Sequence, residues 1–439
     1  MPKPYARLAD RIAARIATGE LPIGARLPPQ RRFAYEQGIA VSTASRVYEE
    51  LRNRGLVSGE VGRGTYVANR FAPLDPAVQE PSRAGIDLEI MFRLSAQARG
   101  DIAASTAQFF RSELPDWAAA PSSVTGPMGA MRALAGVMGA RGHSVSPECL
   151  LCAGNGKQAI SACFSALAPR GGRIAVEALT YPYAIATARL LGIELVPLQL
   201  DEEGVMPDAL AQTARRGVDA VYLQPTLQSP LVLTMSQARR AAVADVLRRE
   251  NLTAIEDRVY GFLRPAVPLA ALAPDHVIQI DSLSKRLMPG LSVGLIAAPD
   301  RHHGAVARAL RAGGWMASAL SVALAQHWID EGLVARIEVA KRGEAEQMFA
   351  IAETALSRLA FTGAPDALHG WIALPPRWRG ESFAAACAEV GIAVAPGRAF
   401  AVTPGAAPSG VRIAFSTVDL ATWRFALQEV ARLATEGGN

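Results

Sequence analysis

The chain has 439 residues, of which 50% are hydrophobic and 19% are charged, and this balance is typical of a soluble globular protein with two or three domains. No apolar run approaches the roughly 20 residues needed to span a membrane, and the N-terminus has no signal-peptide core, so we expect a cytoplasmic protein. Residues 1–70 carry 12 Lys+Arg against 6 Asp+Glu, whereas the remainder carries 33 against 34. The basic excess therefore predicts a polyanionic partner for the first seventy residues.

The four cysteines do not form a framework of metal ligands or disulfides. Cys149 and Cys152 have the spacing of metal ligands, but no second pair of cysteines or histidines complements them. We expect buried thiols and no metal site.

The first seventy residues predict three short helices and a β-hairpin. Apolar residues at helical spacing favour a helix over 5–18. Pro28 and Pro29 suit the first turn of a second helix that ends near Gln37, and a third helix is predicted over 41–54. Residues 56–67 read as two short strands around a glycine-rich tip. With the positive charge, this order indicates a winged helix-turn-helix whose third helix enters the major groove of DNA.

Several short motifs in this segment resemble the GntR superfamily of transcription regulators: Leu21-Pro22-x-Gly24-x-x-Leu27-Pro28, Tyr48-Glu49-Glu50-Leu51, Gly55-Leu56-Val57 and Gly62-x-Gly64-Thr65-Tyr66-Val67. The resemblance implies DNA contact by the second helix, the recognition helix and the wing tip, through Arg31, Ser42, Thr43, Ser45, Arg46, Arg63 and Gly64.

One position of the recognition helix departs from the GntR pattern. Many members carry arginine where Val41 stands, so base recognition here is expected to use Ser42, Thr43 or Arg46, or a thymine methyl contact from Val41. The alternative for Arg31 and Arg46 is that they are solvated surface charges.

A proline-containing segment without periodicity, residues 71–85, predicts a linker between a DNA-binding domain over 1–70 and a large domain over 86–439. In the large domain, apolar strand-like runs alternate with helical segments such as 159–167 and 236–248. The predicted strands cover residues 173–178, 194–200, 220–224, 253–257, 277–281 and 293–298. This alternation is typical of an α/β fold with a mainly parallel sheet, whose ligands bind at the carboxyl ends of the strands.

After residue 300 the pattern changes to long helices, predicted over 306–312 and 317–353. Shorter strands over 370–374 and 411–415 and a closing helix follow. We therefore expect a smaller C-terminal α+β subdomain.

Lys285, in the run Asp281-Ser282-Leu283-Ser284-Lys285-Arg286, lies between two apolar strand-like segments. Desolvation at the edge of a core lowers the pKa of a lysine, and a free amine beside hydroxyl groups suits Schiff-base chemistry. The chain has only 4 lysines among its 45 Lys+Arg residues, so a lysine here calls for a chemical reason. The alternative is a surface lysine at the end of a strand.

Three other features follow predicted strands. The run Asn155-Gly156-Lys157 opens a helix, whose backbone amides could hold a phosphate. Tyr181 could stack on a planar ring, and the alternative is an ordinary half-buried tyrosine. Asp257 could keep a pyridine nitrogen protonated while Tyr260 bonds a ring hydroxyl. The alternative for Asp257 is a helix cap or a salt bridge.

Together these features resemble the fold-type I pyridoxal 5′-phosphate enzymes of the aminotransferase class. The whole chain resembles the MocR subfamily, in which a GntR domain is fused to an aminotransferase-like domain. The motifs that carry the resemblance are Tyr181-Pro182, Gln224-Pro225-Thr226-Leu227-Gln228, Arg239-Arg240, Ile255-Glu256-Asp257-x-x-Tyr260 and Ser282-Leu283-Ser284-Lys285.

The resemblance implies an internal aldimine at Lys285, a pyridinium partner in Asp257, and an effector carboxylate bound by Arg412. The implied cofactor-binding residues are Asn155, Gly156, Lys157, Tyr181, Ser229, Asp257, Tyr260, Ser282, Ser284 and Lys285.

Three positions depart from the family pattern. Ser229 stands where an asparagine is usual, Ser292 where a phosphate-binding arginine is usual, and Val124 where a tyrosine is usual. Losing the arginine removes a charge-assisted contact worth roughly 1.5–3 kcal/mol. Arg286 or Lys157 could supply the missing positive charge.

These observations predict a homodimeric, pyridoxal-phosphate-dependent regulator that binds operator DNA and senses an amino compound through Lys285. Two alternatives stay open at this point. One is a working aminotransferase that carries a DNA-binding domain, and the other is a repressor whose large domain serves only for dimerisation.

Overall fold

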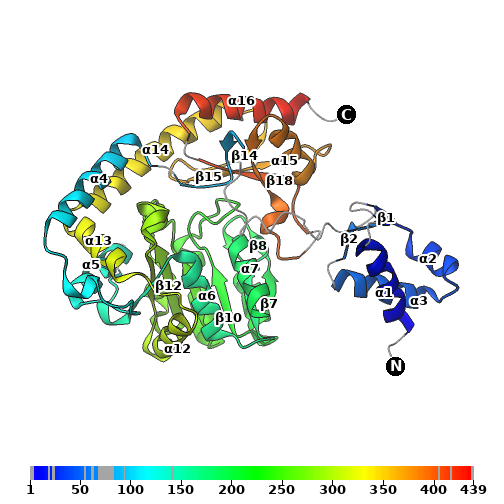
Figure 1. Ribbon diagram of the computed structural model, residues 1–439, viewed down its shortest axis with the longest axis horizontal. Helices are drawn as coiled ribbons and strands as arrows, with labels where there is room; N and C mark the ends of the chain where they lie inside the picture. Colours follow the sequence, from blue (N-terminus) through cyan, green and yellow to red (C-terminus); the bar gives the residue numbers. More distant parts are fainter. Residues whose placement is uncertain are drawn as a thin grey trace. The chain divides into compact units, whose positions relative to one another are not determined.

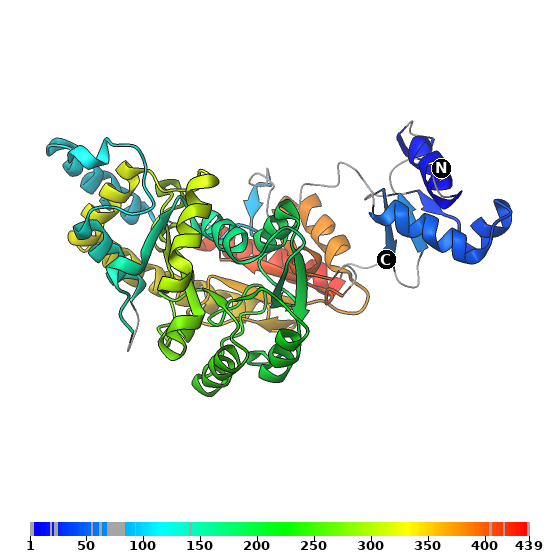
Figure 2. The same cartoon turned by 90° about the horizontal axis from the view of Figure 1, so that it is seen from below.

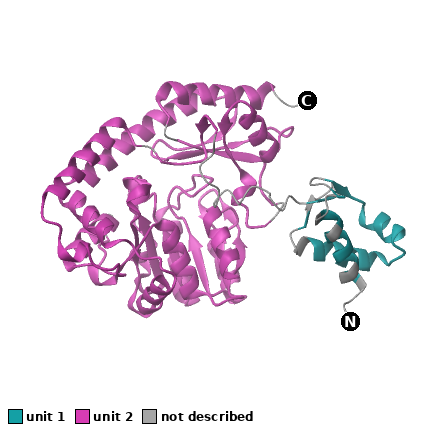
Figure 3. Cartoon of the chain, in the orientation of Figure 1, with its two compact units in different colours: residues 1–79 teal, residues 80–439 magenta. Residues whose placement is uncertain are grey.

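The computed structural model describes residues 4–17, 20–21, 25–53, 56–60, 64–67, 84–92, 94–139, 143–403, 406–415 and 418–436. The chain forms two compact units, residues 1–79 and 80–439 (Figure 3). Most of the predicted linker, residues 71–83, lies outside the described ranges. No helix in these ranges is both long enough and apolar enough to cross a membrane.

The N-terminal unit contains the predicted three helices and hairpin (Figure 1). The helices are α1 (Pro4–Ala17), α2 (Gln30–Glu36) and α3 (Val41–Asn53), and the hairpin is β2 (Val57–Glu60) with β3 (Gly64–Val67). A further strand that the sequence did not predict, β1 (Arg26–Leu27), pairs antiparallel with β3. The prediction of a winged helix-turn-helix is therefore confirmed.

The core of this unit fixes α3 against the turn before α2. The rings of Phe33 and Tyr48 pack edge to face with their centroids 5.3 Å apart. The hydroxyl of Tyr48 donates to the carbonyl oxygen of Pro28 at 2.6 Å. Because the apolar side of α3 is held in this way, its opposite side remains available to a partner.

The large unit is built on a seven-stranded sheet in the order β5-β13-β12-β11-β10-β6-β7. The strands are β5 (Leu150–Ala153), β6 (Arg173–Glu177), β7 (Glu194–Leu198), β10 (Ala220–Leu223), β11 (Ala254–Asp257), β12 (Val277–Ser282) and β13 (Gly294–Ala297). Only β13 runs antiparallel to its neighbours in this sheet, and the other pairings are parallel. The predicted mainly parallel sheet is confirmed.

Helices cover both faces of the sheet because side chains alternate between its faces (Figures 1 and 2). On one face, Ile174 and Val176 pack with α6 (Gly156–Leu167), α7 (Pro182–Leu191) and α12 (Asp300–Ala312). On the other face, Ala175 packs with α8 (Pro207–Arg215), α9 (Gln237–Arg249) and α10 (Leu269–Leu272). The carboxyl ends of the parallel strands remain uncovered by this packing.

The smaller subdomain contains an antiparallel sheet in the order β14-β15-β18-β17, with strands Ala360–Thr362, His369–Ala373, Gly410–Ala414 and Ala395–Pro396. The helices α15 (Gly380–Glu389) and α16 (Leu420–Glu436) belong to the same subdomain. The prediction of one helix over 317–353 was wrong. The chain forms α13 (Ala319–Asp330) and α14 (Leu333–Ala355), because Gly332 adopts φ +69° between them.

The first described residues after the linker run along the smaller subdomain. Strand β4 (Ile86–Asp87) pairs in parallel with β16 (Ile392–Ala393), and Leu88 is fully buried. We call residues 86–92 the strap. The chain then continues into α4 (Ala96–Arg111) and α5 (Met128–Met138).

Candidate functional site

Lys285 lies in a short helix, α11 (Leu283–Arg286), which begins directly where β12 ends. Its Nζ donates to the carbonyl oxygen of Met91 at 3.1 Å and lies 3.8 Å from the centroid of the Phe92 ring. Burial, and then the positive charge of Arg412, hold the pKa of Lys285 well below its usual value. The alternative of a surface lysine at a strand end is therefore wrong.

Backbone contacts on both sides hold Lys285 in position. The hydroxyl of Ser282 accepts from the backbone N–H of Ser284 at 3.1 Å and caps α11. From α14, Lys341 Nζ donates to the carbonyl oxygens of Lys285 at 2.6 Å and Leu287 at 3.0 Å. Lys341 was not identified from the sequence, because a contact with backbone carbonyls leaves no residue pattern.

Ser292 stands where the family has a phosphate-binding arginine, and Arg286 does not replace the positive charge of that arginine. Its guanidinium is buried and pairs with Asp281 at 2.6 Å and with Glu338 at 2.5 Å. Two carboxylates already balance its charge, so that part of the expectation was wrong. Ser292 is exposed, with φ +54°, and its hydroxyl donates to the carbonyl oxygen of Pro289 at 3.3 Å.

Asp257 ends β11 and is buried among neutral hydrogen-bond donors. Its Oδ2 accepts from the Tyr222 hydroxyl at 2.6 Å and from Gln224 Nε2 at 3.4 Å, and its Oδ1 accepts from the N–H of Val259 at 3.0 Å. Burial raises the pKa of Asp257 to about 6. A carboxylate in such a setting favours a cationic partner.

Two tyrosines approach the same region. The hydroxyl of Tyr260 donates to Met91 Sδ at 3.3 Å, and its ring packs against His369 with a centroid distance of 5.5 Å. Tyr181 precedes the first turn of α7 and is half-buried. Burial raises the pKa of each tyrosine, and both feel the charges of Asp257 and Arg412. The fold thus brings Tyr181, Tyr260, Asp257 and Arg412 together.

The N-terminus of α6 packs closely against the strand that leads to Lys285. Asn155 caps the helix by accepting from the N–H of Gln158 at 2.9 Å. A Cβ at Gly156 would lie 3.3 Å from Ser282 Cβ, and a Cβ at Gly294 would lie 2.4 Å from the Asn155 carbonyl. The first amides of α6 therefore lie beside the hydroxyl groups of Ser282 and Ser284, where helix geometry leaves N–H groups available to an anion.

Lys157, one residue into α6, extends over the ring of Tyr183 with its Nζ 5.2 Å from the centroid. Partial burial lowers the pKa of this amine. Lys157 is the other residue expected from the sequence to supply positive charge to a bound phosphate. It lies next to Gly156 in the first turn of α6.

Arg412 on β18 is 6% exposed and reaches from the smaller subdomain toward the large sheet. Its Nη1 donates to Ser229 Oγ at 3.2 Å, and its Nη2 donates to the carbonyl oxygen of Glu89 at 2.5 Å. Its Nε is buried and has no hydrogen-bond partner among the residues that the structure describes. The guanidinium also lies over Phe400 at 4.9 Å from the ring centroid. Ser229, which stands where the family usually has an asparagine, therefore contacts Arg412, the residue expected to bind the effector carboxylate.

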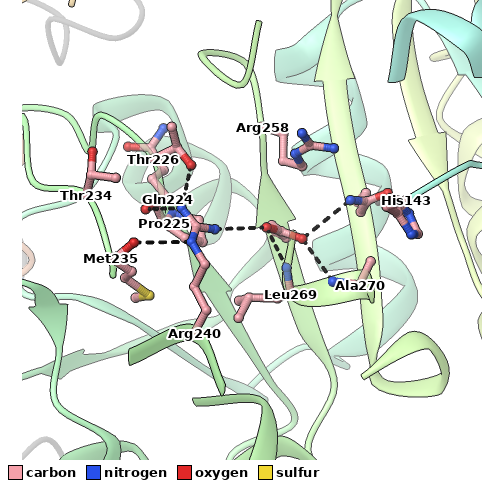
Figure 4. A network of polar contacts seen from close by, with 12 residues as sticks. His143, Gln224, Pro225, Thr226, Thr234, Met235, Arg240, Arg258, Leu269 and Ala270 are labelled. Atoms are coloured by element: carbon pink, nitrogen blue, oxygen red, sulfur yellow. Dashed lines mark hydrogen bonds and ion pairs between the residues drawn. The ribbon is translucent and has the colours of Figure 1, made fainter. Parts of the chain in front are cut away.

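A buried polar network supports the loop that carries Gln224 (Figure 4). Arg240 on α9 donates to the carbonyl oxygens of Pro225 at 2.8 Å and Met235 at 3.2 Å, and to Thr226 Oγ1 at 2.7 Å. Its Nη1 lies 3.7 Å from Glu256 Oε1, with both side chains almost fully buried.

Glu256 extends this network to the amides that begin α10. It accepts from the backbone N–H groups of Leu269 at 3.0 Å and Ala270 at 3.2 Å, as Figure 4 shows. Glu256 precedes Asp257 on β11, so its side chain points to the opposite face of the sheet. The network therefore fixes the strand and the loop that place Asp257 and Gln224.

The structure tests the accessibility of the proposed DNA-binding residues. Arg31, Ser42 and Arg46 are exposed, Thr43 is half-buried, and Val41 is 48% exposed. Ser45 is also half-buried, and its hydroxyl donates to Gln30 Oε1 at 2.8 Å, so it ties α3 to α2. Gly64 begins β3, whereas Arg63 lies outside the described residues.

The four cysteines are not paired with one another in disulfides. All four are free thiols, and within the described ranges no group of three or more His, Cys, Asp or Glu side chains could hold a metal ion.

Comparisons with known families match both units. Residues 4–67 match the model of bacterial regulatory proteins of the gntR family, and residues 127–430 match aminotransferase class I and II. The HTH-type transcriptional regulator YdeF of Bacillus subtilis is 26% identical over 424 residues, covering 93% of this chain and 89% of YdeF. The HTH-type pyridoxine biosynthesis transcriptional regulator PdxR of Corynebacterium glutamicum is 25% identical over 302 residues, covering 67% and 65% of the two chains.

Among solved structures, an archaeal alanine:glyoxylate aminotransferase has a TM-score of 0.74 at 22% identity, covering 89% of this chain and 94% of that one. This likeness establishes the fold of the large unit, and the two family matches establish how the units are combined. The chain is a member of the MocR subfamily of GntR transcriptional regulators, with a helix-turn-helix domain joined to an aminotransferase-like domain.

Proposed function

We propose that this regulator binds pyridoxal 5′-phosphate at Lys285 and senses an amino compound there, and that the bound compound changes its affinity for operator DNA. The observation that carries the proposal is the state of Lys285. Its side chain is half-buried, its Nζ donates to the carbonyl oxygen of Met91 at 3.1 Å, and desolvation together with the charge of nearby Arg412 holds its pKa well below the usual value. A neutral amine is the reactive form toward an aldehyde.

The residues present fit this cofactor. The amides that begin α6, with Ser282 and Ser284, offer donors to a phosphate. Asp257, which lacks a cationic partner among its bonded neighbours, would hold a proton on the pyridine nitrogen. Tyr260 would bond the ring oxygen. When bound, pyridoxal phosphate supplies an aldehyde that reacts reversibly with primary amines.

Arg412 would select an effector that carries a carboxylate. A guanidinium binds carboxylates bidentately, and Nε of Arg412, which has no partner within the described ranges, adds a donor beside Nη2. Ser229 would hold the other side of the guanidinium through its contact with Nη1.

DNA binding is proposed for Arg31, Ser42, Thr43, Arg46 and the wing at Gly64, with Ser45 acting through Gln30. We also propose a homodimer, because helix-turn-helix proteins of this kind read paired half-sites. The proposed site of action is the cytoplasm, and the proposed domain limits are 1–70, 71–85 and 86–439.

The first test is the visible absorption spectrum after pyridoxal phosphate is added to the wild type and to Lys285→Ala. We expect a cofactor band in the wild type alone, with circular dichroism establishing that the variant is folded. A duplex selected by the protein from a random library then serves as the DNA ligand. Its affinity is measured with and without the cofactor and a panel of amino acids. DNA affinity that is indifferent to both additions would overturn the proposal.

The rival function is a working aminotransferase, and the presence of Lys285, Asp257, Tyr260 and Arg412 in the chain supports it. Turnover of an amino acid with a keto acid, without any effect on DNA binding, would support it. A large unit that neither binds the cofactor nor reacts would serve as a dimerisation scaffold.

A further inference from the structure

The strap occupies donors of the proposed effector site. Met91 accepts from Lys285 Nζ through its carbonyl oxygen at 3.1 Å and from the Tyr260 hydroxyl through its Sδ at 3.3 Å. The carbonyl oxygen of Glu89 accepts from Arg412 Nη2 at 2.5 Å. Lys285, Tyr260 and Arg412, which all have proposed roles, thus donate hydrogen bonds to the three-residue stretch from Glu89 to Met91.

Backbone pairing anchors the other end of the strap to the smaller subdomain. The N–H groups of Ile86 and Leu88 donate to the carbonyl oxygens of Gly391 at 3.0 Å and Ala393 at 2.9 Å, and the N–H of Ala414 donates to the carbonyl oxygen of Leu88 at 2.7 Å. The chain beyond Leu88 lacks this pairing in the described structure. There it is held by the buried side chain of Met91, which packs with Leu227 and Tyr260, and by a local turn.

Asp87 forms that turn. Its Oδ1 accepts from the N–H groups of Glu89 at 2.8 Å and Ile90 at 3.3 Å. A side chain that bonds the backbone two and three residues later orders a tight bend. The bend presents the carbonyl oxygen of Glu89 to Arg412.

An effector carboxylate must compete with the strap for Arg412. Bidentate binding needs two adjacent donors, and Nη2 is bonded to Glu89 while Nη1 is bonded to Ser229. A charged carboxylate forms stronger bonds to a guanidinium than a neutral carbonyl does. An effector carboxylate can therefore displace the carbonyl oxygen of Glu89 from Arg412. An amine without a carboxylate forms no such bond to the guanidinium and leaves Glu89 in place.

We propose that the strap is an internal occupant of the effector site, and that an effector carboxylate binding at Arg412 releases residues 89–92. The strap continues directly from the linker that follows the DNA-binding unit. Residues 86–88 keep their pairing with the smaller subdomain when residues 89–92 are released, so the linker stays attached to that subdomain. Release frees the smaller subdomain from the contacts with Lys285 and Tyr260, and a movement of this subdomain then carries the signal to the linker. This inference rests on the proposed function and adds the element that transmits the signal.

The test compares two probes, N-(5′-phosphopyridoxyl)-L-leucine and the matching adduct of 3-methylbutylamine, which lacks the carboxylate. Titration calorimetry first establishes binding of each adduct to the full-length protein. Amide hydrogen exchange is then followed in the peptide that covers the strap. We expect exchange to become about tenfold faster with the leucine adduct and to stay unchanged with the amine adduct.

Two outcomes are distinguished by this design. If neither adduct binds, the proposed function itself fails. If the leucine adduct binds and the strap exchanges at the same rate or more slowly, the strap proposal alone is overturned, because the segment then stays in place or closes over the ligand.

A pair of variants tests the competition between the strap and the effector carboxylate for Arg412 without a measurement of hydrogen exchange. Asp87→Ala removes the acceptor that orders the bend, whereas Asp87→Asn removes the charge and keeps a side-chain oxygen. We expect Asp87→Ala to bind the leucine adduct about fivefold more tightly than Asp87→Asn does. Asp87→Ala should also shift the affinity for the selected DNA duplex toward the effector-bound value when no adduct is present. Equal affinities of the two variants for the adduct would contradict the proposal.

Discussion

Lys341 donates a hydrogen bond from its buried ammonium to the carbonyl oxygen of Lys285, at 2.6 Å. Two of the four lysines in the chain therefore meet at the candidate site. Burial lowers the pKa of Lys341 to about 8, so it is mostly protonated at neutral pH. Its charge in turn contributes to the lowered pKa of Lys285, after burial and Arg412.

Replacing Lys341 by methionine should therefore have two effects. It leaves the carbonyl oxygens of Lys285 and Leu287 without their donor, which should lower the free energy of unfolding by about 3 kcal/mol. It also removes a positive charge near Lys285, so the pKa of Lys285 should rise. The reaction of the protein with pyridoxal phosphate, followed by visible absorption, should then need a higher pH than in the wild type. An unchanged pH dependence would show that Lys341 acts only on stability.

The buried pair Arg240 and Glu256 should be strongly coupled. Arg240→Met leaves the carboxylate of Glu256 buried without its cation, and should lower the free energy of unfolding by about 3–5 kcal/mol. The double variant Arg240→Met with Glu256→Gln should recover part of this loss, because the uncompensated charge is removed. Urea unfolding of the two single variants and the double variant measures the coupling, and additive losses would contradict it.

Glu177 should make the stability of the protein without cofactor depend on pH. Burial raises its pKa to about 8, and its Oε1 accepts from the N–H of Gln224 at 3.1 Å. Between pH 6.5 and 8 the folded protein keeps this proton while the unfolded chain has lost it, so the contribution of Glu177 to stability falls as pH rises.

Glu177→Gln should remove that contribution. The stability of the variant relative to the wild type should therefore increase by about 2 kcal/mol between pH 6.5 and 8. Because the result is a difference between two proteins, the titration of Lys285 and other shared groups cancels. Denaturant unfolding at both pH values measures it, and a constant difference would mean that Glu177 is already ionised in the folded state.

Arg31 and Arg32 offer a matched comparison for DNA binding. Both are exposed on α2, but Arg32 Nε pairs with Glu36 Oε1 at 2.7 Å. If Arg31 contacts a phosphate, Arg31→Ala should reduce the slope of log affinity against log salt by about 0.9 on any duplex. Arg32→Ala should change it much less. Fluorescence anisotropy with a random-sequence duplex at several salt concentrations tests this, and a slope for Arg31→Ala equal to that of the wild type would remove Arg31 from the interface.

The sequence by itself determined the two-domain plan and most elements of secondary structure. Apolar runs of strand length placed the central strands to within two residues, because a buried parallel strand must be hydrophobic on both faces. The motif residues likewise placed Lys285, Asp257 and Tyr260 at the ends of strands. The helix predicted over 317–353 failed because a single glycine with positive φ outweighed a continuous apolar pattern.

Only the tertiary structure decided what surrounds these residues. The hydrogen bonds of Lys341, of Arg240 and of the strap are made largely to backbone carbonyl oxygens. Every residue has a backbone carbonyl, so no pattern of side chains in the sequence predicts these contacts. The balance of charge around Arg286 likewise depends on Asp281 and on the distant Glu338. The sequence therefore determined which chemical groups the site contains. The packing of distant segments decided which of those groups are free, which are already paired, and which the strap occupies.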